Sequence, residues 1–243
     1  MAAADRSRQD AQPAFVLHSY PFRETSLVLE VFTRNHGRLA LVARGARRPR
    51  SALRGILLAF QPLLLSWAGK SELRTLHKAE WQGGLPQLAG GGLLCGFYLN
   101  ELMLKLLARE DAHEALFESY YRTLRELGNG ADQAATLRRY EVRLLKELGY
   151  ALTLDRDAAT GAQIEAGRTY FYVIERGPVQ TSGDDGGNQI KLCGQTLLDM
   201  SRDEYSSPVT LQQGKALMRM LINHYLGTQT LHTRQLLRDL QQL

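Results

Sequence analysis

Apolar and polar residues alternate in several short segments of the first third of the chain. Such a two-residue period is typical of strands that bury one face. The segments are residues 14–18, 26–33, 38–44, 55–68 and 72–79. Pro62 predicts an irregularity in the fourth of them. Five short strands separated by turns predict a small antiparallel barrel or sandwich.

A glycine-rich break at residues 83–92 ends this pattern, and the apolar period then becomes that of a helix. Helices are predicted over residues 93–108, 112–127, 132–148, 194–200, 210–226 and 233–240, and strands over 168–174 and 189–192. Asp132 is a typical N-cap for the third helix, and Gly149 follows its end.

The pattern therefore predicts an α+β chain with several domains. We expect a disordered tail at residues 1–13, a barrel domain at 14–80, and a helical domain at 81–243. A small strand-containing segment at about 155–192 interrupts the helical domain.

Positive charge is concentrated in the predicted barrel. Residues 1–80 contain 13 Lys and Arg against 6 Asp and Glu, whereas the whole chain has a net charge of +5. Seven arginines and no acidic residue lie between positions 34 and 54: Arg34, Arg38, Arg44, Arg47, Arg48, Arg50 and Arg54. The planar guanidinium matches phosphate oxygens, so the run is interpreted as a phosphate-binding surface. The alternative is a solvated basic loop.

Little in the sequence indicates catalysis. The glycine clusters lack the Lys-Ser/Thr ending of a phosphate-binding loop, and the six histidines are scattered. The two cysteines, Cys95 and Cys193, cannot form a four-cysteine zinc site and are expected to be free thiols of a reducing compartment. We expect no enzyme activity, cofactor, metal or membrane span, and a cytoplasmic location.

The third predicted helix carries a basic edge beside apolar positions. Arg138 lies near Val142 and Leu145 at helical spacing. A cation next to apolar side chains suits the acidic and hydrophobic end of a peptide. The alternative is a solvated helix face with local glutamate partners.

Several motifs resemble the RecO family of DNA repair proteins. The resemblance begins with Ala14–His18 and Arg23–Leu29 and continues in Val42-Ala43-Arg44-Gly45-Ala46-Arg47. It extends through Phe60–Leu63 and Tyr98–Leu102 to Leu137–Glu141 and Leu148-Gly149-Tyr150. The matches keep their order and spacing over about residues 14 to 152, and each is weak by itself.

The resemblance implies an N-terminal five-stranded OB-fold barrel, a helical domain and no catalysis. It implies a bacterial, nucleoid-associated protein of the RecF pathway that binds single- and double-stranded DNA and anneals complementary strands. With RecR, such a protein helps to load recombinase onto strands coated by single-strand-binding protein, whose acidic C-terminal tail it holds. Some members have a four-cysteine zinc site, but the corresponding residues 154–167 contain no cysteine.

Barrels of this type bind strands with basic groups and stacked aromatic rings. The seven arginines are the phosphate-binding candidates, and Tyr20, Phe22 and Trp67 are the base-stacking candidates. Arg138, Val142 and Leu145 are assigned to the acidic tail. The residues alone do not separate DNA from RNA, so an RNA- or ribosome-associated protein, or a scaffold for an acidic partner, remains the alternative function. A weaker alternative is an enzyme site within residues 155–190.

Overall fold

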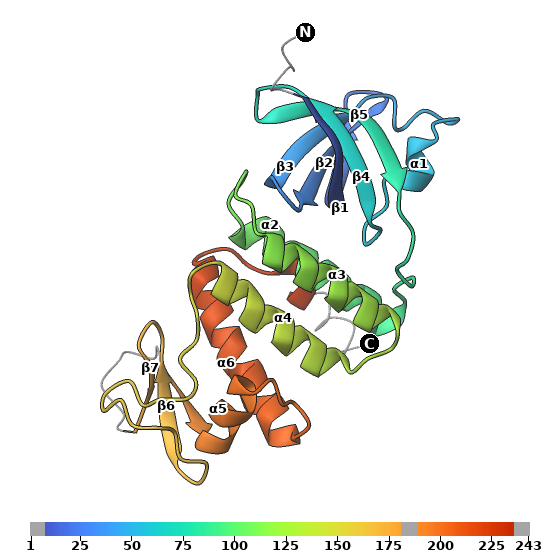
Figure 1. Cartoon of the computed structure of the whole chain (residues 1–243). Helices are drawn as coiled ribbons and strands as arrows, with labels where there is room; N and C mark the ends of the chain where they lie inside the picture. The colour runs from blue at the N-terminus through green and yellow to red at the C-terminus, as the bar shows by residue number, and fades with distance from the viewer. Residues whose placement is uncertain (1–7, 181–188, 236–243) are drawn as a thin grey trace. The chain divides into compact units, whose positions relative to one another are not determined.

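A closed barrel of five strands forms the N-terminal part of the protein (Figure 1). The computed structural model describes residues 8–180 and 189–235. The strands are β1 (Arg8–Phe22), β2 (Ser26–Thr33), β3 (Gly37–Ala43), β4 (Leu63–Ala68) and β5 (Leu73–Trp81). Their order around the barrel is β1-β2-β3-β5-β4, and only β3 and β5 pair in parallel. This confirms the predicted OB-type barrel.

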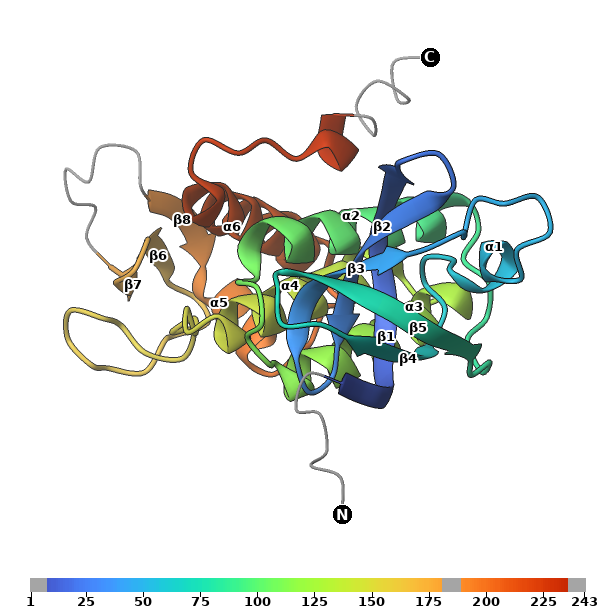
Figure 2. The ribbon, with the colours of Figure 1, turned by 90° about the horizontal axis from the view of Figure 1, so that it is seen from above.

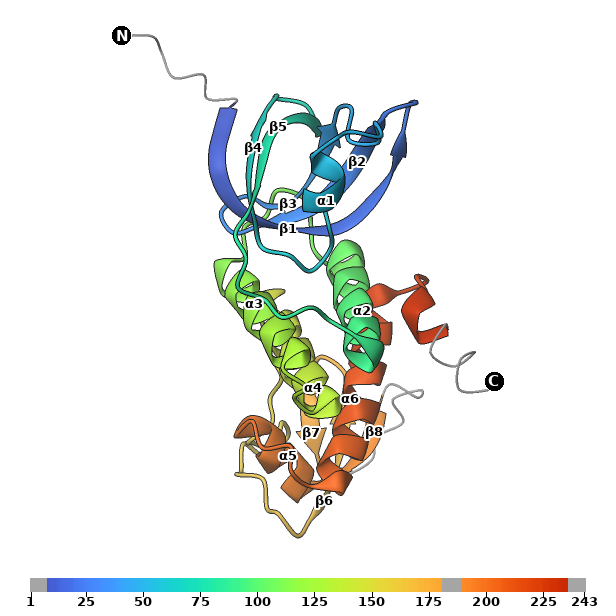
Figure 3. The ribbon, with the colours of Figure 1, turned by 90° about the vertical axis from the view of Figure 1, so that its right-hand side faces the viewer.

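Strand β1 is longer than its sequence pattern predicts. It curves along the barrel wall and pairs with β4 through residues 8–14 and with β2 through residues 14–22 (Figure 3). A register shift between Gln9 and Gln12, with Ala11 at φ 49°, disturbs the alternation that would have revealed the early part of the strand. Residues 8–13, expected in the tail, are therefore strand, and residues 1–7 lie outside the described part of the chain.

The predicted strand over residues 55–68 is wrong in its first half. A short helix, α1 (Leu53–Ile56), comes first, and β4 starts only at Leu63. Phe60 has φ 65°, outside the strand region, and Pro62 cannot donate a ladder hydrogen bond. Leu53 and Ile56 instead pack against the barrel core.

Inward-pointing residues of all five strands fill the barrel. The largest include Leu29, Leu39, Leu63, Leu65 and Trp67, none more than 1% exposed. Burial of this apolar surface stabilises the barrel and fixes strand register, because a one-residue slip would turn these side chains to water.

Helices α2 (Gly90–Leu106) and α3 (Glu114–Gly128) belong to the same compact unit as the barrel, which comprises residues 1–131 and 231–243. The ring of Phe15 in β1 packs edge-on against Tyr120 of α3, with centroids 5.0 Å apart. Asn100 of α2 donates a hydrogen bond to the carbonyl of Leu17 at 2.8 Å. The boundary expected at residue 81 thus falls inside this unit, and a separate barrel domain stays a prediction.

The second compact unit comprises residues 132–230. It contains α4 (Gln133–Glu147), β6 (Thr169–Val173), β7 (Gly177–Val179), β8 (Gln189–Cys193), α5 (Gly194–Ser201) and α6 (Pro208–Leu226). The strands form a sheet in the order β7-β6-β8, and β8 packs against both α5 and α6 (Figure 2). Asp132 caps α4 by accepting a hydrogen bond from the amide of Ala135 at 2.7 Å, as predicted.

Candidate nucleic-acid interface

An open groove of about 810 Å³ lies on the barrel. It forms because β3 runs antiparallel to β2 and parallel to β5, which brings the β1–β2 turn, the end of β3 and the start of β5 together. Its lining residues are Phe22, Arg23, Glu24, Thr25, Ser26, Val42, Arg44, Gly45, Arg48, Leu73 and Thr75.

The groove is predominantly basic. Arg23, Arg44 and Arg48 line it, against the single carboxylate of Glu24. Within residues 8–180 and 189–235, neither Arg44 nor Arg48 forms an ion pair, and the same holds for Arg50 in the following loop. All three side chains are exposed. Exposed guanidinium groups that form no ion pair are available to phosphate oxygens.

Arg47 joins the two walls of the groove. Its backbone amide donates to the carbonyl of Thr25 at 2.8 Å. Its guanidinium donates to the carbonyls of Arg23 and Glu24 at 3.4 and 3.2 Å. These bonds attach the loop after β3 to the β1–β2 turn, so Arg47 has a structural role beside the one that its charge predicts.

Arg38 is not available to DNA, which corrects its assignment. It is partly buried, pairs with Glu30 at 3.1 Å, and donates to the carbonyl of Leu107 at 3.0 Å. Burial, together with the nearby charge of Arg109, lowers the pKa of Arg38. The charge of this partly buried guanidinium is compensated by the carboxylate of Glu30 rather than by water.

Two further arginines of the run do not line the groove. Arg34 lies in the β2–β3 turn, at the opposite end of β3 from Arg44, and pairs with Glu118 at 3.4 Å. Arg54 is exposed on α1, which follows the basic loop. Their contact with DNA stays a prediction.

The three aromatic candidates have different surroundings. Phe22 lines the groove, with the guanidinium of Arg23 5.2 Å from its ring centroid, and Tyr20 is 42% exposed on β1. Trp67 is fully buried and packs edge-on against His36. Its assignment to base stacking is therefore wrong, because its position in β4 points inward with Leu63 and Leu65.

The predicted tail site on α4 is largely inside its unit. Arg138 pairs with Glu141 at 2.6 Å, and both side chains are buried. Leu145 is fully buried, and only Val142 is half-buried. Leu145 cannot touch a peptide in this conformation, and this assignment is corrected; the i,i+3 spacing of Arg138 and Glu141 favoured the internal pair.

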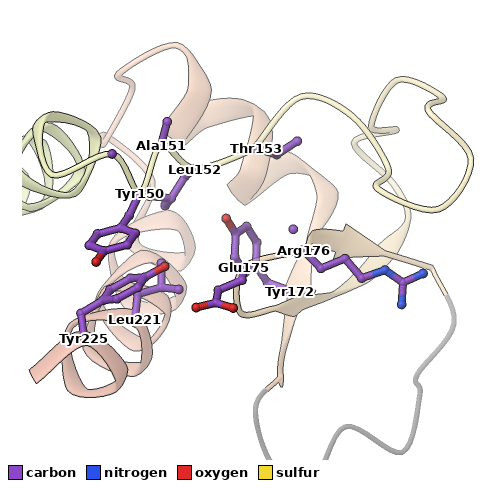
Figure 4. Close-up of a pocket in the computed structure, with 11 residues that line it drawn as sticks. Tyr150, Ala151, Leu152, Thr153, Tyr172, Glu175, Arg176, Leu221 and Tyr225 are labelled. Carbon is purple, nitrogen blue, oxygen red and sulfur yellow. The ribbon is translucent and has the colours of Figure 1, made fainter. Parts of the chain in front are cut away.

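A second cavity, of about 260 Å³, lies in the unit of residues 132–230 (Figure 4). The rings of Tyr150 and Tyr225 stack with centroids 3.9 Å apart at one side of it. Tyr172 and Glu175 face them from the β6–β7 region, whereas Arg176 points away (Figure 4). Burial raises the pKa of Tyr172. No motif of the sequence predicts this cavity.

Sequence reasoning also missed Arg23, Leu73 and Thr75 in the groove. Arg23 could have been found as a basic residue of the first turn. Leu73 and Thr75 join the groove only because β5 pairs with β3, a parallel pairing that local patterns do not encode.

The described residues contain no group of three or more His, Cys, Asp or Glu side chains placed to hold a metal ion. None of the helices described is both long and apolar enough to cross a bilayer.

Comparison with known proteins decides the family. The family model "Recombination protein O N terminal" matches residues 9–84, and "Recombination protein O C terminal" matches residues 90–235. The chain belongs to the RecO family. It is 59% identical to the DNA repair protein RecO of Nitrosospira multiformis over 98% of this chain and 99% of that protein. It is 56% identical to that of Aromatoleum aromaticum over 99% of this chain and 100% of that protein.

Membership in RecO confirms the resemblance drawn from the motifs and gives the chain a role in DNA repair and recombination. The names of the family and of these relatives denote repair proteins and no enzymatic activity, in agreement with the expected non-enzymatic function. The N-terminal family model covers the whole barrel from β1 to β5 apart from the first residue of β1, and therefore the entire groove.

Proposed function

We propose that the chain is a DNA-binding recombination mediator that grips phosphates at the barrel groove. The proposed contacts are Arg44, Arg48 and Arg50, with Arg47 and Arg54 at the margin. The observation that carries the proposal is the group of three exposed arginines without an ion-pair partner in the described structure, beside an open groove. Phosphate contacts of this kind bind single and double strands with little sequence preference.

Annealing follows from the same surface. Two complementary strands repel each other, and an arginine-lined groove lowers that repulsion when it neutralises phosphates of either strand. Phe22 and Tyr20 are proposed to stack on bases at the β1–β2 end of the groove. With RecR, and held by the acidic tail of single-strand-binding protein, the protein then helps to load recombinase onto coated strands of the nucleoid.

Strand annealing tests this function. Complementary oligonucleotides coated with single-strand-binding protein are mixed with the chain, and duplex formation is followed over time. The variant with Arg44→Ala, Arg48→Ala and Arg50→Ala should lose most of the acceleration. A control with Arg202→Ala, Lys215→Ala and Arg219→Ala removes the same charge from exposed positions of the other unit and should anneal normally.

An equal loss of annealing in both variants would show that only the net charge of the protein matters. If the unaltered protein does not accelerate annealing, the RNA-binding or scaffold alternative is favoured. A parallel assay with complementary RNA strands measures the preference for DNA over RNA directly.

The tail contact needs its own experiment because Arg138 is paired inside the unit. Calorimetry with the acidic tail peptide compares Arg138→Ala with Glu141→Gln, which retains the cation and removes the charge of its partner. A tail site at Arg138 predicts lost binding in the first variant and equal or tighter binding in the second. Unchanged affinity in a folded Arg138→Ala variant rejects the site.

A further inference from the structure

The barrel presents one tryptophan to water. The chain contains two tryptophans. Trp67 is 0% exposed in the core, whereas Trp81, the last residue of β5, is 60% exposed. A large aromatic side chain left in water loses the free energy that burial would give it, so its exposure calls for an explanation.

The Trp81 ring is anchored at its edge by a hydrogen bond. Its indole nitrogen donates to the side-chain oxygen of Gln61 at 2.9 Å. The next residue, Gln82, donates its amide to the carbonyl of Pro62, also at 2.9 Å. Gly83 lies against the ring with φ 69°, and a Cβ there would approach the indole to 3.5 Å. The ring is thus supported by backbone at its edge and keeps most of its surface open.

The loop that holds Trp81 also supports other exposed apolar groups. Leu58 is 51% exposed, and Phe97 of α2 is 45% exposed and packs edge-on against Phe60 at 5.1 Å. Phe60 and Gln61 are neighbours in the sequence, so the segment of residues 57–62 contacts both exposed rings, those of Phe97 and Trp81.

This region follows the basic segment in the chain. The arginine loop leads directly into α1, which carries Arg54, and α1 packs against β5, whose last residue is Trp81 (Figure 1). Residues 57–62 follow α1 in the chain. Single-stranded DNA has the chemistry that matches both parts, because its phosphates pair with arginine and its unpaired bases have flat apolar faces.

We propose that Trp81 is a base-stacking residue for single-stranded DNA, in addition to the arginine groove. A base lies on the open face of the fixed indole while arginines of the loop and of α1 hold phosphates of the same strand. A duplex keeps its bases stacked on one another, so Trp81 contributes to single-strand binding alone. This inference rests on the proposed DNA-binding function.

The first test measures affinity of the full chain for a labelled oligothymidylate and for a duplex of equal length by fluorescence anisotropy. Replacing a base-stacking aromatic residue by alanine typically weakens single-strand binding strongly. Trp81→Ala should therefore reduce the single-strand affinity about tenfold. Duplex affinity should not change, and Trp81→Phe should retain most single-strand affinity. Val209→Ala, a change at another exposed apolar residue, is the control and should bind normally.

The second test uses the two tryptophans. Oligothymidylate should quench the fluorescence of the unaltered protein, and Trp81→Phe should abolish that quenching although the variant still binds. Unchanged single-strand affinity of Trp81→Ala, or an equal loss for the duplex, overturns the inference. In that case the triple variant Arg44→Ala, Arg48→Ala and Arg50→Ala separates the two proposals. If this variant binds neither the single strand nor the duplex, the proposed function stands without Trp81. If it binds both normally, the proposed function fails as well.

Discussion

Glu101 and Thr233 are joined by two hydrogen bonds although 132 positions separate them in the chain. One oxygen of the Glu101 carboxylate accepts from the amide and the hydroxyl of Thr233, and the other accepts from the amide of His232 at 2.8 Å. Lys105 pairs with the same carboxylate at 3.0 Å. The carboxylate therefore fixes residues 232 and 233 against α2.

Glu101→Gln should destabilise the fold, because its carboxamide keeps only one acceptor oxygen, so that its NH2 group would face either the donors of Thr233 or the amide of His232. We expect the free energy of unfolding to fall by about 2 kcal/mol, typical of hydrogen bonds to a charged group. Urea denaturation at neutral pH measures the change. The change Glu72→Gln at an exposed position of the β4–β5 turn serves as a control and should leave the midpoint unaltered.

The free energy of unfolding should also depend on pH through the titration of Glu101. Burial acts to raise the pKa of Glu101, but hydrogen bonds from Thr233, His232 and Lys105 outweigh it and lower the pKa to about 2. Since the folded pKa lies below the ordinary value of 4.5, the stabilisation is complete above pH 4.5 and is lost as the pH falls toward 2. Denaturation curves across this range should converge for the unaltered protein and Glu101→Gln; a constant difference at all pH values contradicts this.

Arg38→Ala should act on stability and not on DNA contacts. Its removal leaves the buried carboxylate of Glu30 with Arg109 as its remaining partner and frees the carbonyl of Leu107. Breaking a buried ion pair costs about 3 kcal/mol, so the denaturation midpoint should fall clearly. The salt dependence of DNA binding should keep its slope, and a reduced slope would return Arg38 to the phosphate-binding set.

Arg44, Arg48 and Arg50 should determine the salt dependence of DNA binding. Replacing all three by alanine should reduce the slope of log affinity against log salt by about 2 for single strands and about 3 for duplex. Thermal stability should barely change because none of the three pairs with an anion in the described structure. Binding measured across a salt series tests this, and an unchanged slope would show that these arginines are only solvated.

Trp67→Ala should lower the free energy of unfolding far more than Trp81→Ala. Removing a fully buried tryptophan leaves a cavity and costs about 4 kcal/mol. The exposed Trp81 should cost less than about 1 kcal/mol by the same measurement. Similar losses at the two positions would contradict the different burial of their rings.

Local patterns predicted those elements whose signals are local. Alternation predicted β2 and β3 within one or two residues, and Asp132 marked the start of α4. The early part of β1 was missed because the irregularity at Ala11 disturbs its period, and β7 because three residues are too few to show one.

The site was predicted only in part for a different reason. An arginine run shows charge but not direction, and successive strand residues point to opposite faces. Arg38 and Arg44 lie at opposite ends of β3, roughly 20 Å apart at the usual rise per residue. The carboxylate of Glu30 that binds Arg38 comes from the adjacent strand, at a position that only the register of β2 and β3 defines.

Trp67 and Trp81 show that the burial of a side chain, too, is not predicted by the local sequence. Both lie in strand-forming sequence, but one is enclosed by the barrel and the other is at the end of its strand. Their burial depends on where the barrel closes, which is a property of the pairing of β4 with β5.

The bonds between Arg47 and the β1–β2 turn have a consequence for the speed of binding. Because these bonds already attach the loop after β3 to the β1–β2 turn, the proposed binding of a strand requires no new contact between these two walls of the groove. A preorganised cationic surface of this kind avoids the entropic cost of closure and lets long-range attraction limit the association rate. If the groove binds strands as proposed, it suits rapid capture and rapid release of successive strand segments, the kinetic behaviour that the proposed annealing requires.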